Sequence, residues 1–171
     1  MKVHLLRSRD VSRDFYNQVY EFLIIDDSSF IICQSRRTVS FSGETLTWDE
    51  IFSSCNQVRQ EQQIPDDEFI VLLTSLPNED NWFSACDPQG LNNIFIHTGD
   101  WEYYVPCDPQ YPVAYQIVEN ILERLMNFDL QSMIDHAHVP PRGCISDMCN
   151  WKAEINLKIR TGDICEECLS I

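Results

Sequence analysis

The feature that most restricts this chain is a set of two close cysteine pairs near its C-terminal end. Cys144 and Cys149 are separated by four residues, Cys165 and Cys168 by two, and fifteen residues lie between the pairs. Each short spacing places two sulfurs on one turn, and four thiolates arranged in this way suit a tetrahedral zinc. Because four protein ligands leave no position for water or substrate, the sequence predicts a structural Zn²⁺ site with one ion per chain.

The segment between the two cysteine pairs is expected to be extended. In residues 153–160, Ile155, Leu157 and Ile159 alternate with polar residues, which is the pattern of a strand. Gly162 stands before the second pair and lets the backbone fold around the metal. We therefore expect residues 140–171 to form a zinc-binding segment that packs on a core made by residues 1–139.

The rest of the sequence favours a reducing compartment. The longest apolar runs, such as FLII and FIVLL, are too short to span a bilayer, and charged residues interrupt the N-terminal stretch. We expect no membrane association and a cytoplasmic location, where disulfides are rare and clustered thiols bind metals. The scattered cysteines are expected to act as small apolar side chains, and they are Cys33, Cys55, Cys86 and Cys107.

The charge balance argues against nucleic acid as a partner. The net charge is −15, which repels a phosphate backbone. A local basic strip of Lys152, Lys158 and Arg160 is the exception that the sequence leaves open. The acidity otherwise favours solubility and a basic or neutral protein partner; the sequence does not indicate an oligomeric state.

Apolar periodicity predicts an α/β (mixed α+β) fold. With 171 residues, 44% of them hydrophobic, the chain is long enough for one layered domain. Helical spacing covers residues 11–24, the stretch after Trp48, where Thr47 and Glu50 form a capping box, and residues 111–128. Strands are expected at residues 2–7, 29–34, 38–42, 68–76, 94–98 and 101–105, with a long loop at 77–93. This order of elements predicts a mixed sheet with packed helices.

A second metal site is the alternative source of chemistry. His136 and His138 alternate along an extended segment, so both side chains can face one metal, with His97 or Glu119 completing the set. Two histidines and a carboxylate with an open position form a catalytic zinc site. On this interpretation the protein is a metal-dependent hydrolase.

Cysteine nucleophiles are less well supported. Cys86 and Cys107 each precede an aspartate, Asp87 and Asp108, whose negative charge raises the pKa of a neighbouring thiol. A reactive cysteine needs the opposite shift. Neither residue is therefore expected to start a covalent reaction.

The C-terminal cysteine pattern resembles that of the archaemetzincin family of zinc peptidases. That family carries HExxHxxGxxH directly before C-x4-C and ends on CxxC at a structural zinc. The resemblance implies that Cys144, Cys149, Cys165 and Cys168 hold the structural zinc. It does not extend to the peptidase site, because the five positions that should carry the three histidines, the glutamate and a following methionine hold Met133, Ile134, Ala137, Gly143 and Trp151.

The sequence thus predicts a noncatalytic, metzincin-like protein-interaction domain with a structural zinc. Aromatic residues in the loop region are the candidate contacts with a partner, since such residues are enriched in interface hot spots. They are Trp82, Trp101, Tyr103 and Tyr104. The metal content separates this hypothesis from the hydrolase, because the first requires one zinc per chain and the second requires two.

Overall fold

A computed structural model describes residues 1–24, 30–127 and 129–170, and it confirms a mixed α/β fold. Ser29 and Phe128, at the ends of two predicted segments, lie outside this range. The strands are β1 (Lys2–Ser8), β2 (Ile31–Val39), β3 (Phe69–Thr74), β4 (Ser84–Cys86) and β5 (Asn93–His97). The α-helices are α1 (Arg13–Leu23), α2 (Trp48–Gln62), α3 (Gln110–Met126), α4 (Leu130–His136) and α5 (Ile155–Thr161).

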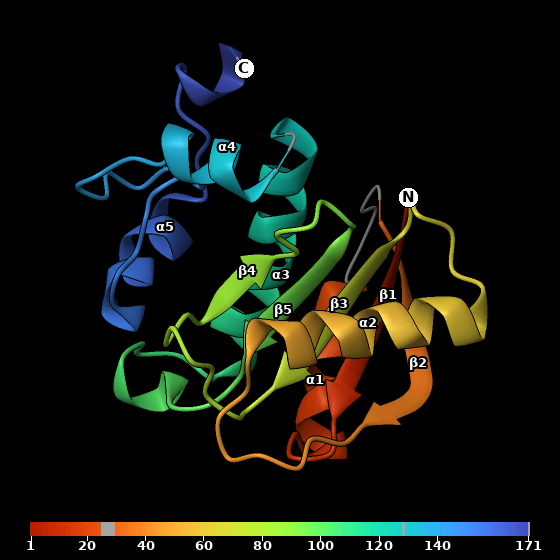
Figure 1. The fold of residues 1–171 in the computed structure, drawn as a ribbon. Coiled ribbons are helices and arrows are strands. Elements are labelled where there is room, and N and C mark those ends of the chain that lie inside the picture. Colours follow the sequence, from red (N-terminus) through yellow and green to blue (C-terminus); the bar gives the residue numbers. More distant parts are fainter. Residues whose placement is uncertain (25–29, 128, 171) are drawn as a thin grey trace.

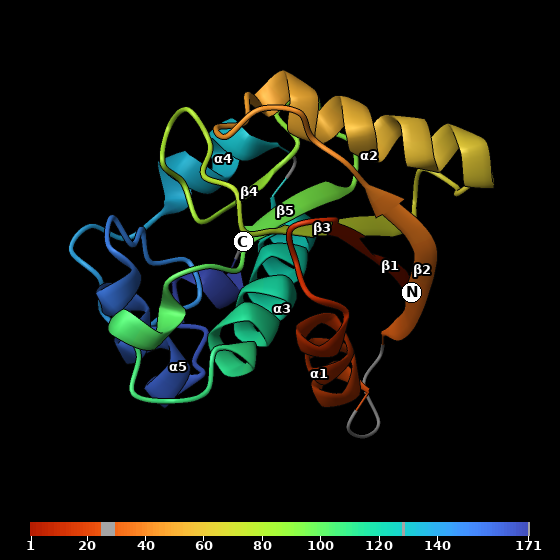
Figure 2. The same cartoon turned by 90° about the horizontal axis from the view of Figure 1, so that it is seen from below.

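The strands form one sheet in the order β2-β1-β3-β5-β4. All neighbours are parallel except β4, which runs antiparallel to β5 and forms the edge of the sheet. Figures 1 and 2 show α2 on one face of the sheet and α1 and α3 on the other. The central strand β3 is buried along its whole length, as its continuous apolar run predicts for a strand covered on both faces.

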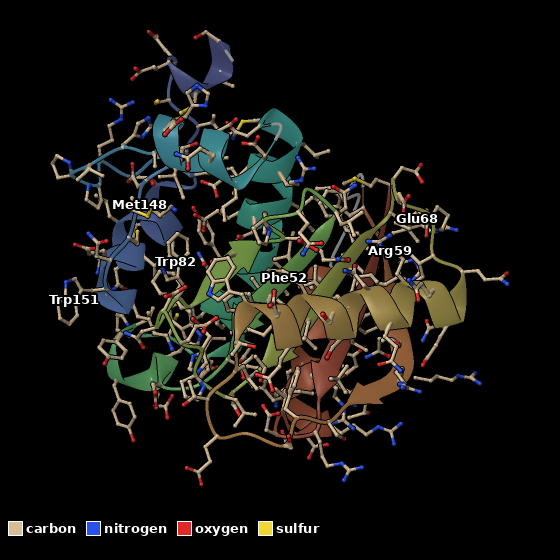
Figure 3. All side chains as sticks on the ribbon, in the orientation of Figure 1. Phe52, Arg59, Glu68, Trp82, Met148 and Trp151 are labelled. Carbon is tan, nitrogen blue, oxygen red and sulfur yellow. The ribbon has the colours of Figure 1, made fainter. Side chains whose placement is uncertain are left out.

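Side chains of β3 alternate between two cores because successive residues of a strand point to opposite faces. Val71 and Leu73 pack with α1 and α3, whereas Ile70 and Leu72 pack with α2. On the α2 side, Phe52 belongs to this second core (Figure 3). The predicted capping box starts α2, with Glu50 N–H donating to Thr47 Oγ1 and Thr47 N–H to Glu50 Oε2.

The far end of α2 is fastened by a buried arginine. Arg59 donates to the carbonyls of Pro65, Glu68 and Asn92 and to the Asn93 side chain (Figure 3). Because these bonds pair both terminal nitrogens of a residue that is only 6% exposed, they fix the loop between α2 and β3. Glu68 turns outward from the same loop to pair with Lys2 and His4.

Four local predictions were wrong. Residues 153–160 form most of α5 and not a strand, and residues 101–105 begin with the 3₁₀ helix η1 (Trp101–Tyr103). Residues 38–42 do not pair with residues 29–34, because β2 is one continuous strand beside β1. The loop predicted at 77–93 contains β4.

The reasons are tertiary. Ile155 and Ile159 are spaced four apart and pack on the main core, which suits a helix as well as a strand. Asp100 adopts a left-handed backbone conformation (φ 65°), and the Trp101 indole is buried and donates to His97 O at 2.9 Å, so the chain turns there. In the described part of the chain, no helix combines the length and the apolar character needed to cross a membrane.

Candidate metal centre and the cavity beside it

Four potential metal ligands converge where the loop after α4 meets the C-terminal turn. They are His138, Cys144, Cys165 and Cys168, and their ligand atoms all lie within 4.8 Å of one another. Cys144 and Cys168 are buried, with 2% of their surface exposed, and the other two are partly exposed. In Figure 1 this C-terminal part packs beside α3, at the end of the molecule far from β2.

The spacing of these atoms fits a tetrahedral ion. With Zn–S bonds of about 2.3 Å and Zn–N bonds of about 2.0–2.1 Å, a tetrahedron separates two sulfurs by about 3.8 Å and a nitrogen from a sulfur by about 3.6 Å. The Sγ atoms of Cys144 and Cys168 are 3.7 Å apart. His138 Nε2 lies 3.3 Å from Cys168 Sγ and 3.8 Å from Cys165 Sγ. Three thiols and an imidazole are donors that zinc prefers, and the chemistry they support is a closed site.

Asp147 orients this cluster. Its Oδ1 lies 3.0 Å from His138 Nδ1, so that nitrogen carries the proton, and Nε2, which accepts a hydrogen bond from Arg142 Nη2 at 2.6 Å, faces the sulfurs. Its Oδ2 accepts the backbone N–H groups of Arg142, Gly143 and Cys144. One buried carboxylate therefore holds both the histidine and the turn that carries the first cysteine.

The turn at Gly143 requires glycine. Its φ is +98°, and a Cβ there would lie 2.8 Å from Cγ2 of Thr161, which is closer than van der Waals contact allows. Thr161, the last residue of α5, hydrogen-bonds to Gly143 O. Any side chain at this position would therefore force α5 away from the metal loop.

The structure leaves Cys149 out of the cluster, which differs from the four-cysteine set that the sequence predicts. The loop turns after Cys144, and Cys149 lines a cavity on the other side of it, beside Glu119 and Lys158. Burial raises the pKa of the Cys149 thiol to about 12. His138 stands in its place among the ligand atoms.

Glu119 and Lys158 form a buried ion pair under the loop. Each is at most 4% exposed, and Lys158 Nζ also donates to Asp147 O at 2.8 Å. Gln116 donates to the other oxygen of Glu119, and Ser84 donates to Gln116 at 2.6 Å. This network connects α3, α5, β4 and the metal loop.

The cavity has a volume of about 260 Å³ and is bordered by α3, β4, α4 and the loop at residues 146–150. Trp82 and Met148 both line it and are labelled in Figure 3. Glu123, one turn after Glu119 on α3, is half-buried in its wall. Burial, reinforced by the charge of Glu119, raises the pKa of Glu123 to about 8.

Three solved structures are similar in fold to this protein. A zinc-dependent peptidase from Methanocorpusculum labreanum matches with a TM-score of 0.62 and 15% identity, covering 98% of each chain. Archaemetzincin from Methanopyrus kandleri matches with a TM-score of 0.62 and 13% identity, covering 99% of this chain and 92% of that one. Archaemetzincin from Archaeoglobus fulgidus, in complex with malonate, gives 0.55 and 13% over 99% of both chains.

The fold is archaemetzincin-like. No protein-family model matches the sequence, and no curated protein sequence is significantly similar to it. The likeness in fold to the solved structures covers 98–99% of this chain, well beyond the cysteine motif on which the resemblance in sequence rests.

Counting back from Cys144 by the family's motif spacing assigns the first two histidine positions and the glutamate position to residues that line the cavity. Met133, Ile134 and Ala137, on and just after α4, all line it. The third histidine position is Gly143, whose backbone conformation and contact with Thr161 exclude a side chain.

The four residues of the alternative hydrolase site have separate surroundings. His138 belongs to the thiolate cluster, and His136 Nδ1 lies 2.8 Å from Asn127 Oδ1. Glu119 is paired with Lys158. His97 lies between Ser75 O and Lys152 Nζ, and burial, with a contribution from the Lys152 charge, lowers its pKa to about 4.

The remaining cysteines and aromatics complete the comparison with the sequence. Burial raises the pKa of Cys86, and burial and Asp108 raise that of Cys107. Trp101, one of the candidate contacts with a partner, is fully buried and offers no surface for such a contact, whereas Tyr103 and Tyr104 are 77% and 43% exposed. Trp151 is a further exposed aromatic and points away from the core in Figure 3.

The basic strip that the sequence left open does not exist. Lys158 is only 3% exposed because it pairs with Glu119. Lys152 is half-buried, donates to Gly99 O and lies 4.7 Å from the centre of the Trp101 ring. Only Arg160 of the three is exposed.

Proposed function

We propose that this chain is a noncatalytic, archaemetzincin-like domain that binds a protein partner and is stabilised by one structural zinc. The observation that carries the proposal is the identity of the residues at the motif positions. Ile134 and Ala137 have no donor for zinc, the Met133 thioether is a weak one beside an imidazole, and none of the three moves a proton. A histidine at Gly143 would need a left-handed backbone conformation and would clash with the Thr161 side chain. A metzincin-type hydrolysis needs three histidines and a glutamate at these places.

The zinc in this proposal has a structural role. When bound by His138 and three thiolates, it has no open position for water, and it joins the loop after α4 to the C-terminal turn. The eight cysteines all lie in the described part of the chain, and none is in a disulfide, which fits a reducing compartment such as the cytoplasm.

The cavity beside β4 is the proposed contact with the partner. It combines apolar walls from Trp82, Phe83 and Met133 with an edge strand. Edge strands and apolar hollows are the features that proteins use to hold an extended segment of another chain. Tyr104 and Trp151, both exposed, border a second hollow that shares Trp82 and Phe83 with the first.

The alternative function is a metal-dependent hydrolase that uses His136 and His138. Its support is that a solved structure of this fold is described as a zinc-dependent peptidase and others as archaemetzincins. It requires His138 to leave the thiolate cluster or to serve two metals, and it requires His136 to leave Asn127.

Peptide cleavage tests the noncatalytic part of the proposal. Zinc-loaded protein is incubated with unfolded casein and a mixture of quenched fluorescent peptides, with and without a chelator. We expect no chelator-sensitive cleavage. Chelator-sensitive cleavage that disappears in the His136→Ala variant would establish the hydrolase in its place.

Peptide binding tests the partner site. Peptides selected from a display library on the zinc-loaded protein should bind saturably and should lose at least tenfold in affinity in Met133→Arg, which places a charge in the cavity. Leu125→Arg is the matched control, because Leu125 is 57% exposed on α3 and lies outside the cavity. Failure to select any binder, or binders indifferent to Met133→Arg, would contradict the assignment.

A further inference from the structure

The cavity beside β4 has the size of a site for one side chain. Its volume of about 260 Å³ lies below the roughly 300–1,000 Å³ of pockets that hold a drug-sized ligand or a cofactor. It reaches the surface, because Asn81, Ile134 and Asn150 among its lining residues are exposed. A residue from an extended chain lying along β4 can therefore enter it.

The charges around the cavity are unbalanced toward the negative. Lys158 is the one cation among the described lining residues, and it is committed to Glu119 and to Asp147 O. The Asp147 carboxylate is committed to His138 and to three backbone N–H groups. Among the described lining carboxyl groups, those of Glu123 and Asp80 accept no hydrogen bond from the described residues, and of these two only Glu123 is partly buried in the wall, since Asp80 is exposed.

Glu123 is set to respond to a cation. Its carboxyl group lies close enough to Glu119 for the two charges to repel, and burial adds to the cost of ionisation. A positive group at about 4–6 Å would favour the ionised form and offset both effects. The cavity wall thus presents a carboxyl group whose ionisation is favoured by the arrival of a cationic ligand.

The other walls suit the stem of a long basic side chain. Trp82, Phe83, Met133 and Met148 provide apolar and aromatic surface. Lysine and arginine cover apolar surface with their methylene groups, and their cationic heads are attracted to aromatic faces. Ser84, Gln116 and Asn120 bond to one another and hold Glu119 in place, so these side chains already have partners within the protein.

We propose that this cavity binds one lysine or arginine side chain of a partner polypeptide, with Glu123 as its anionic contact. The inference rests on the proposed function, because it names the kind of residue by which the partner is recognised. The acidic surface of the chain, with a net charge of −15, favours the approach of such a partner.

Three small probes test the proposal on the full, zinc-loaded chain. They are the N-acetyl, N-methylamide derivatives of lysine, arginine and norleucine, the last having the same stem as lysine without the charge. Binding is followed by the shifts of the Ser84, Asn120 and Met148 amide resonances in ¹⁵N spectra. We expect saturable binding of the lysine or arginine probe and at least tenfold weaker binding of the norleucine probe.

Two variants locate the charge that is responsible. In Glu123→Gln the preference for the basic probe over norleucine should disappear, whereas Glu44→Gln, which removes an exposed carboxylate outside the cavity, should retain it. Glycine N-methylamide, which carries only an α-ammonium group, tests for a chain N-terminus and should bind more weakly than the lysine probe.

The outcomes separate this inference from the proposed function. Norleucine binding as tightly as lysine, an undiminished lysine preference in Glu123→Gln, or tighter binding of glycine N-methylamide would overturn the inference, even if selected peptides still depended on Met133. A preference for the lysine probe in the native protein that disappears in Glu123→Gln would support the inference even if cleavage of peptides were found. In that case the cavity would be the specificity site of a hydrolase.

Discussion

Breaking the buried ion pair should be the most damaging single change in the C-terminal part of the chain. In Lys158→Met, Glu119 would remain 4% exposed without its counter-charge, and the carbonyl of Asp147 would lose its donor. Removing one partner of a buried pair costs about 3–5 kcal/mol, because the other must either stay ionised in a poorly solvated site or take up a proton. For a domain of this size, about 2–4 °C of melting temperature is lost per kcal/mol, so we expect a decrease of roughly 6–20 °C.

The assay is urea unfolding of zinc-saturated protein, with the midpoint and slope measured for each variant. Arg160→Met is the matched control, because Arg160 is exposed on the same helix and its loss should change stability by no more than about 0.5 kcal/mol. The double variant Lys158→Met, Glu119→Leu should recover most of the loss, since it removes both charges. A loss below about 1 kcal/mol in Lys158→Met alone, or no recovery in the double variant, would refute this reasoning.

Two further predictions concern the thiols and the pH dependence. Cys149→Ser should keep its full zinc content by elemental analysis, whereas Cys165→Ser should lose zinc under mild chelation, because one missing thiolate opens the tetrahedron; equal zinc content in the two variants would count against the ligand set. Glu123 has a pKa raised to about 8 in the folded protein, above its unfolded value, so its contribution to stability is present at low pH and is lost as the pH rises from about 4.5 to about 8. Glu123→Gln should therefore gain stability relative to the native protein across that interval, by at least about 1 kcal/mol, since one pKa unit corresponds to about 1.4 kcal/mol; a pH-independent difference in urea unfolding would show that the raised pKa is wrong.

The elements that could be predicted from the sequence are those that a single pattern determines. The apolar run of β3 fits only a strand buried on both faces, and the capping box of Thr47 and Glu50 marks the start of α2. By contrast, the spacing of Ile155, Leu157 and Ile159 fits both the two-residue period of a strand and the period of about 3.6 residues of a helix. The helix wins because Lys158, at an otherwise polar position, is drawn inward by Glu119, a contact between residues 39 apart in the sequence.

The metal centre shows a similar limit. Spacing indicated three residues of the cluster of potential ligands, but the fourth depends on which side of the loop each donor faces, and Asp147 sets that side for His138. The sequence contained a signal in His138, six residues before Cys144, yet alternation with His136 pointed to a different metal. The distances from His138 Nε2 to the sulfurs of Cys168 and Cys165 show that this histidine faces them, and the contact of Asp147 Oδ1 with Nδ1 holds it there.

The cavity could not be anticipated at all from local patterns. Its walls come from β4, which a polar loop composition concealed, and from α3, which carries two acidic residues one turn apart, Glu119 and Glu123. Burial of charged residues on a helix that packs against a sheet is a signal that becomes readable only once the packing is known.

The coordination shell of the bound zinc is the most direct measurement of the central claim. X-ray absorption at the zinc edge, on protein with its metal content measured, counts the sulfur and nitrogen neighbours of the ion. The account predicts one zinc per chain with three sulfurs at about 2.3 Å and one nitrogen at about 2.0 Å, and the nitrogen should be lost in His138→Ala. A shell of four sulfurs would return Cys149 to the site, and a second zinc with a nitrogen and oxygen shell would contradict a noncatalytic domain held by a single structural ion.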